Sequence, residues 1–198
     1  MRVAEAIGRA LVADGVDTAF GLLGSGNLTV TNAMRDAGAR FVSARHECGA
    51  VCMTDGYGRV SGRLAACSVH QGPGLTNTIT GLTEAAKSRT PLLVLAADTP
   101  SAALRSNFRI DQAGLVEAVG AVAERVHGPD TALADAARAV RRARVERRAV
   151  VLMLPLDVQA RDCEYAPVAA APELAPVRPA AAARCWRTPA PRCAGSAS

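Results

Sequence analysis

The stretch Phe41-Val42-Ser43-Ala44-Arg45-His46-Glu47-Cys48-Gly49-Ala50 runs from an apolar segment into the start of a helix, with a glutamate at the junction. In an open α/β sheet the ligand crevice lies beyond the carboxyl ends of the strands, so this pattern puts Glu47 where a ligand would bind. Partial burial there raises the affinity of a carboxyl group for a proton. Acidic residues also favour the first turn of any helix, and the stretch taken alone fits that ordinary role better.

Short apolar segments alternate with amphipathic ones on both sides of this stretch and predict an α/β domain. Residues 92–95 and 150–152 are apolar at nearly every position, which is typical of parallel strands buried on both faces. We expect a doubly wound, mostly parallel sheet flanked by helices on both faces. The expected helices cover 2–14, 29–37, 47–62, 113–120 and 131–144, with another from the turn at 72–74 to about 87; the expected strands cover 18–21, 40–44, 64–69, 91–96, 121–126 and 150–154.

The composition changes abruptly after the last expected strand. Residues 1–160 carry the apolar periodicity and are expected to form one domain, whereas residues 161–198 form a low-complexity tail, mostly Ala, Pro and Arg from residue 166 onward. Such a tail cannot bury enough apolar surface to offset the entropy of ordering it. We therefore expect it to be disordered, with the chain from Asp162 onward packing against nothing.

The bulk composition excludes several classes of function. Aromatic residues make up only 3% of the 198 residues, so stacking platforms for single-stranded nucleic acid are missing. The net charge of +5 is concentrated in residues 138–148 and near the C-terminus, which fits a solvated helix face, and we expect no nucleic-acid partner. No secretory signal and no segment of membrane-spanning length are present, so we expect a cytoplasmic protein without membrane contact. The six cysteines lack zinc-site spacing, and we expect no metal ligands in this chain.

Six short segments occur in a distinctive order: Phe20–Gly24, Arg45–Ala50, Asp55–Gly62, Gly72–Asn77, Pro91–Val94 and Leu154–Val158. Together they resemble the N-terminal, pyrimidine-binding domain of thiamine diphosphate-dependent enzymes of the acetolactate synthase and 2-oxoacid decarboxylase group. The resemblance runs from Met1 to about Gln159. It implies the α/β fold that the periodicity predicts and names thiamine diphosphate as the cofactor.

The resemblance also implies roles for individual residues. The Glu47 carboxyl group would bond to a pyrimidine nitrogen and favour the tautomer in which the cofactor's own amino group acts as a base. His70 would line the site as a proton donor or carboxylate partner, although many acetolactate synthases have a smaller polar residue there. The two expected catalytic residues are thus Glu47 and His70, and the expected cofactor-binding residues are Glu47, Gly24, Gln71, Gly72, Pro73 and Asn77.

Two of these positions have other interpretations. Gly24 lies in a loop that fits a plain tight turn, and Asn77 fits the cap of a helix. His46, next to Glu47, is expected to point into packing or an interface. Residues 108–112 only partly match the Phe-Gln-Glu segment of the family, which leaves the contacts to an acceptor substrate open.

In the family that the sequence resembles, a separate C-terminal domain holds the diphosphate and its magnesium. The Gly-Asp-Gly motif of that domain is not found in this sequence, so we expect a truncated chain that holds half of a site. A homo-oligomer or a separate diphosphate-binding chain would complete it. The implied substrate is a 2-oxoacid such as pyruvate. Overall resemblance favours a carboligase and His70 a decarboxylase; the alternative is a non-catalytic domain that folds or dimerises without turnover.

Overall fold

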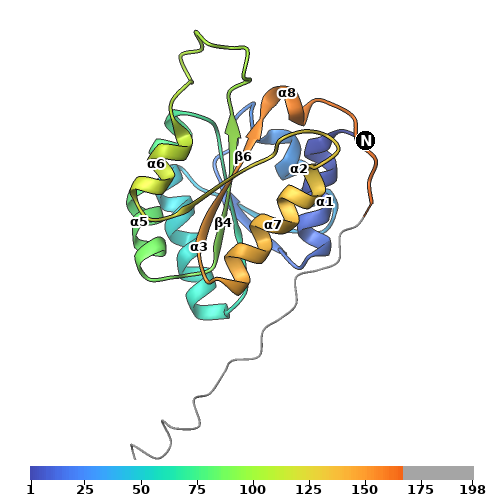
Figure 1. Ribbon diagram of the computed structural model, residues 1–198. Helices are drawn as coiled ribbons and strands as arrows, with labels where there is room; N and C mark the ends of the chain where they lie inside the picture. Colours follow the sequence, from blue (N-terminus) through green and yellow to red (C-terminus); the bar gives the residue numbers. More distant parts are fainter. Residues whose placement is uncertain (167–198) are drawn as a thin grey trace, which may run out of the picture.

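The computed structural model describes residues 1–166 and has a six-stranded sheet between two layers of helices (Figure 1). The sheet order is β2-β1-β3-β4-β6-β5, and every pairing is parallel. The expected α/β class is confirmed, with a sheet that is parallel throughout. The strands are β1 (Thr18–Gly21), β2 (Arg40–Ser43), β3 (Ala66–Val69), β4 (Leu92–Asp98), β5 (Val122–Arg125) and β6 (Ala149–Pro155).

Helices cover both faces of the sheet (Figure 1). One face carries α1 (Val3–Ala13), α2 (Leu28–Asp36) and α7 (Ala132–Val145), with the short α8 (Leu156–Gln159) at its upper end. The opposite face carries α3 (Glu47–Ser61), α5 (Ile79–Lys87) and α6 (Gln112–Ala118), and the single turn α4 (Pro73–Thr76) precedes α5. The chain thus winds to both sides of the sheet, as the alternating pattern predicts.

Alternate residues of the central strands pack into two apolar layers. In β4, Leu93 and Leu95 join the layer under α1, α2 and α7, whereas Leu92 and Val94 join the layer under α3, α5 and α6. All seven residues of β4 and all seven of β6 are buried. Since neither face of these strands meets water, both segments are apolar without the polar alternation of a half-exposed strand.

The helix expected to run unbroken to about residue 87 is interrupted. Two backbone bonds close α4: the N–H of Asn77 donates to the carbonyl of Pro73, and the N–H of Thr78 donates to that of Leu75. The Thr78 hydroxyl donates to the same Leu75 carbonyl at 2.7 Å. A new helix, α5, then begins at Ile79. Because the helix is broken here, Asn77 lies between α4 and α5 and not within one continuous helix.

The N-terminus is held by residues assigned above to the tail. Arg2 forms an antiparallel bridge with Asp162, and the N–H of Cys163 donates to the carbonyl of Met1 at 2.8 Å. The expectation that the chain packs against nothing from Asp162 onward is therefore wrong for these two residues, because the edge of the N-terminal segment offers unpaired backbone groups. The expectation for residues 167–198 lies outside the described residues.

The contact between α1 and α2 depends on one glycine. A Cβ at Gly8 would stand 2.7 Å from the Cβ of Ala33 and 2.7 Å from the carbonyl oxygen of Val30. Both distances are far shorter than van der Waals contact, and the carbonyl belongs to a helix backbone that cannot yield locally. Only a residue without a side chain lets the two helices approach this closely.

Replacing Gly8 with Ala should therefore destabilise the protein by about 1–3 kcal/mol, the usual cost of overpacking. Gly56→Ala is the matched control, because Gly56 also lies within a helix but a Cβ there meets no atom within 4 Å. The control should gain up to about 1 kcal/mol from improved helix propensity. Urea denaturation of both variants measures the difference, and equal midpoints would contradict the interpretation.

Candidate functional site

The connection that follows β1 and the connection that follows β3 run in opposite directions along the sheet. From β1 the chain passes outward to β2, and it then returns to place β3 on the other side of β1. Loops that diverge in this way open a crevice at the carboxyl ends of the two strands, where α/β proteins bind ligands. Residues 22–27 follow β1 and residues 70–72 follow β3, so these two loops form the walls of the crevice.

Glu47 reaches the same edge from the neighbouring strand. It is the first residue of α3, four residues after the end of β2, and its side chain is 7% exposed. Its Oε2 accepts a hydrogen bond of 2.9 Å from Nδ2 of Asn77. Its Oε1 faces the backbone of Gly74, 3.6 Å from the point that a Cβ there would occupy. One carboxylate oxygen is thus fixed by the protein, and the other lies beside a residue without a side chain.

His70 lies on the other side of Gly74. A Cβ at Gly74 would stand 3.0 Å from the Cβ of His70, so the same glycine borders both expected catalytic residues. The imidazole Nε2 lies 3.4 Å from Oγ of Ser25, and Nδ1 lies 3.2 Å from the carbonyl of Gln71. The ring also packs edge-on against Phe108, with the ring centroids 5.1 Å apart. Phe108 belongs to residues 99–111, which connect β4 to α6. Its contact with His70 places this connection against the crevice.

Glycines permit this arrangement. A Cβ at Gly24 would overlap the His70 ring, 2.6 Å from its Cδ2. At Gly72 the backbone has φ of 61°, in the left-handed region, and a Cβ would stand 2.5 Å from the Phe108 carbonyl oxygen. Pro73 is exposed at the first residue of α4. The structure therefore brings together Glu47, His70, Gly24 and Asn77, and it leaves Pro73 at the surface.

Gln71 and Gln112 lie beneath the crevice. Gln71 is 4% exposed, and its Oε1 has no hydrogen-bond partner within residues 1–166. Its amide oxygen is directed toward Gly26. Gln112 is also buried: its Oε1 accepts from the N–H of Gly72 at 2.9 Å, and its Nε2 donates to the carbonyl of Ala97 at 3.1 Å. Gln112 thus ties the turn after β3 to the end of β4.

A buried asparagine that the sequence interpretation missed fixes the loop after β1. Asn27 is fully buried, its Oδ1 accepts from the N–H of Gly24 at 2.8 Å, and its Nδ2 donates to Oγ of Ser68 at 2.9 Å. Thr31 completes the network with a 2.7 Å contact to the same Ser68 hydroxyl. The tight-turn interpretation of this loop is therefore correct, and the turn also borders His70. A polar residue just before a helix was the available signal.

The far end of the same edge carries a partly buried ion pair. Asp98, the last residue of β4, pairs with Arg125, the last residue of β5, across the intervening β6. Burial raises the pKa of the Asp98 carboxyl, and the Arg125 charge and the N–H of Thr99 oppose that shift without cancelling it. No sequence motif marked this pair, since its members are joined only by the sheet.

His46 does not point into packing. Its side chain is exposed, and Nδ1 accepts a hydrogen bond of 3.2 Å from the N–H of Cys48. It therefore caps the start of α3 and supports the turn on which Glu47 stands. Within residues 1–166, no three His, Cys, Asp or Glu side chains gather as metal ligands. The helices in this part of the chain are all too short or too polar to cross a membrane.

Comparison with known proteins gives a consistent answer. Residues 1–119 match the family model described as thiamine pyrophosphate enzyme, N-terminal TPP binding domain. The chain is 36% identical over 162 residues to a probable 2-ketoarginine decarboxylase of Pseudomonas aeruginosa, covering 79% of this chain and 29% of that protein. It is 33% identical over 163 residues to a sulfoacetaldehyde acetyltransferase of Rhodobacter capsulatus, covering 80% and 27%.

A third relative adds the acetolactate synthases. The large subunit of acetolactate synthase isozyme 2 of Escherichia coli is 38% identical over 95 residues, 48% of this chain and 17% of that subunit. In each of these three relatives the chain spans less than a third of the full length.

The bond between Asn77 and Glu47 generates a test of the site's electrostatics. Asn77→Asp should place a second carboxylate against Oε2 and cost about 1–3 kcal/mol of stability at pH 7, since a donor is replaced by a like charge. Asn77→Ala removes the donor alone and should cost less.

Urea denaturation at pH 7 measures these differences. Thr76→Ala is the control, because Thr76 is an exposed neighbour whose hydroxyl bonds only to the Pro73 carbonyl. An Asp variant as stable as the Ala variant at neutral pH would show that Asn77 and Glu47 do not contact each other in solution.

Proposed function

The chain belongs to the thiamine pyrophosphate enzymes through their N-terminal TPP binding domain, and on that premise we propose that it provides the pyrimidine-facing half of a thiamine diphosphate site in a 2-oxoacid carboligase or decarboxylase. The observation that carries the proposal is the position of the Glu47 carboxylate. It is buried at the carboxyl edge, with one oxygen bonded to Asn77 and the other beside Gly74.

The residues around the crevice fit such a ring. A flat heterocycle needs a wall without a bulky side chain, and Gly74 supplies one beside Oε1 of Glu47, while Gly24 makes room for the His70 ring. It also needs a carboxyl group able to share a proton with a ring nitrogen, and Glu47 is a buried acid at this edge. Phe108 adds an apolar surface against His70.

When bound, thiamine diphosphate supplies a ring carbon that adds to the carbonyl group of a 2-oxoacid. Glu47 holds a proton at a pyrimidine nitrogen and so favours the tautomer that can act as a base. Asn77 positions that carboxyl group by its bond to Oε2. His70, oriented by Ser25 and the Gln71 carbonyl, donates a proton or pairs with a carboxylate on the substrate side.

The relatives support two reaction types for the complete enzyme. They include a probable decarboxylase, an acetyltransferase and an acetolactate synthase. His70 beside Glu47 favours decarboxylation, because a histidine at this point can deliver the proton that replaces carbon dioxide. The carboligase remains the second candidate, supported by the acetolactate synthase similarity.

We further propose that the diphosphate and its magnesium are held outside this chain, by a separate diphosphate-binding chain. The sequence contains no Gly-Asp-Gly motif, and residues 1–166 contain no cluster of metal ligands. Without such a partner the chain would bind the cofactor weakly and turn nothing over.

Glu47→Gln tests the proposed role directly. The amide can still accept the Asn77 bond but cannot give up a proton, so folding should be kept while product formation from pyruvate falls about 10²-fold or more in the assembled enzyme. Glu117→Gln, an exposed acid of α6, is the control and should leave activity unchanged. Full activity of a folded Glu47→Gln complex, or failure of the variant to fold, would refute the proposed role.

Calorimetric titration of the chain alone tests the division of the site. Thiamine and thiamine diphosphate should bind with similar, weak affinity, because the chain contacts the ring and not the charged anchor. Magnesium should make no difference to either affinity. Tight, magnesium-dependent binding of thiamine diphosphate would mean that this chain itself contains the diphosphate site.

A further inference from the structure

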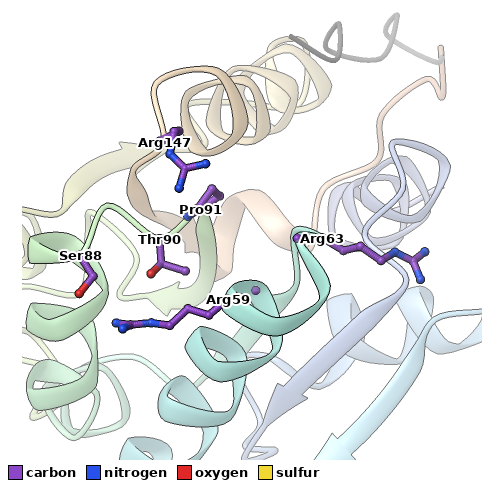
Figure 2. Close-up of a pocket in the computed structure, with 8 residues that line it drawn as sticks. Arg59, Arg63, Ser88, Thr90, Pro91 and Arg147 are labelled. Atoms are coloured by element: carbon purple, nitrogen blue, oxygen red, sulfur yellow. The ribbon is translucent and has the colours of Figure 1, made fainter. Parts of the chain in front are cut away.

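A pocket of about 360 Å³ lies at the edge of the sheet opposite Glu47 (Figure 2). Its walls come from the C-terminal end of α3, the connection from α5 to β4 and the connection from α7 to β6. Arg59 in its wall lies twelve residues after Glu47 on α3, about 18 Å along the helix axis. The pocket is therefore separate from the crevice and independent of the function proposed above.

Three arginines contribute to the pocket, and they differ in how they are neutralised. Arg59 pairs with Asp55 at 2.8 Å and with Glu84 at 2.9 Å. Arg63 pairs with Asp17, and its side chain is directed away from the other lining residues (Figure 2). Arg147 makes no ion pair with a carboxylate within residues 1–166, and its guanidinium is directed toward Thr90 and Pro91 (Figure 2). Arg147 is thus the arginine of this pocket that no carboxylate within residues 1–166 pairs, whereas Arg59 is shared by two carboxylates.

Hydroxyl groups and bare backbone complete the lining. Thr90 is 4% exposed although its hydroxyl faces the pocket, and Ser88 stands next to it at the end of α5 (Figure 2). Gly58 forms part of the opposite wall, and a Cβ there would stand 3.3 Å from Cγ2 of Thr90. The Thr90 hydroxyl and the Arg147 guanidinium thus border the space, whereas the Ser88 hydroxyl donates to Oε1 of Glu84 at 2.8 Å.

We propose that this pocket binds the phosphate group of a small phosphorylated molecule, with Arg147 as the principal anchor. A guanidinium presents paired N–H donors that match an oxyanion, and the Thr90 hydroxyl suits a further oxygen of a tetrahedral group. Arg59 is a second cation at the rim, already shared with Asp55 and Glu84. A volume near 360 Å³ exceeds that of a bare ion and is at the lower end of small-molecule sites.

Arg147 also has an unusual backbone. Its φ is 51°, in the left-handed region, and it is the second residue after α7, the position at which three other helices of the described chain place Gly15, Gly38 and Gly120. Arg89 occupies the equivalent position after α5, with φ of 53°, but does not line the pocket. Replacing either arginine with glycine relieves the same backbone strain. Arg89→Gly is therefore a matched control for Arg147→Gly.

Thermal unfolding of the full chain in millimolar inorganic phosphate tests the proposal, with ionic strength held constant by sodium chloride. Phosphate should raise the Tm of the unmodified protein and of Arg89→Gly by about 3 °C. Arg147→Gly should unfold no earlier than the unmodified protein in chloride and should lose at least about two thirds of the phosphate response. An equal response of both glycine variants would overturn the proposal, as would an equal effect of chloride.

Two further measurements identify the ligand class and the place of binding. Malonate, a dicarboxylate, should raise the Tm less than phosphate does; the reverse order would overturn the assignment to phosphate. In an NMR titration with phosphate, the amides of Thr90 and Arg147 should shift while that of Glu47 stays unchanged. Thr90→Val should weaken the response several-fold, and shifts confined to the crevice would refute the site.

Discussion

The parallel pairing of β1 with β3 is the constraint on which the functional edge depends. Its register matches Phe20 with Cys67 and Gly21 with Ser68. A Cβ at Gly21 would stand 2.4 Å from the Ser68 carbonyl oxygen, so the strands can approach this closely only at a glycine. A slip of two residues would displace the loop after β1 by about 7 Å and break the bond from Asn27 to Ser68. The buried network thus fixes the register as well as the loop.

The two edges of the sheet differ in the charge that they accommodate. In a parallel sheet with crossover helices, helix N-termini gather at the carboxyl edge, and their partial positive charge stabilises acids such as Glu47. Helix C-termini gather at the opposite edge, and their partial negative charge stabilises arginines such as Arg59 and Arg147. Backbone direction alone therefore separates a carboxylate crevice from a guanidinium-lined pocket within one domain.

Sequence patterns predicted those features that arise within a single element. The strands β4 and β6 were recognisable because burial on both faces leaves no polar position, and Glu47 was recognisable because it joins a strand to a helix. The placement of His70 on the same edge followed from its position just after β3.

Features that depend on contacts between distant elements could not be predicted. The helical segment is interrupted at Asn77, and the Asn77 side chain bonds to Glu47, thirty residues earlier in the sequence. The ion pair of Asp98 and Arg125 exists only because β6 brings the ends of two strands to one edge. The bridge from Arg2 to Asp162 joins segments whose local composition gives no indication of pairing.

The strand order also determines when the sheet can close during synthesis on the ribosome. β5 precedes β6 in the chain, yet its only partner in the sheet is β6. At ordinary translation rates residues 126–155 take roughly 2–6 s to appear, and β5 has no strand to pair with throughout that interval. Its charged residues, Glu124 and Arg125, keep this waiting edge soluble, because an apolar unpaired strand would invite association with neighbouring nascent chains.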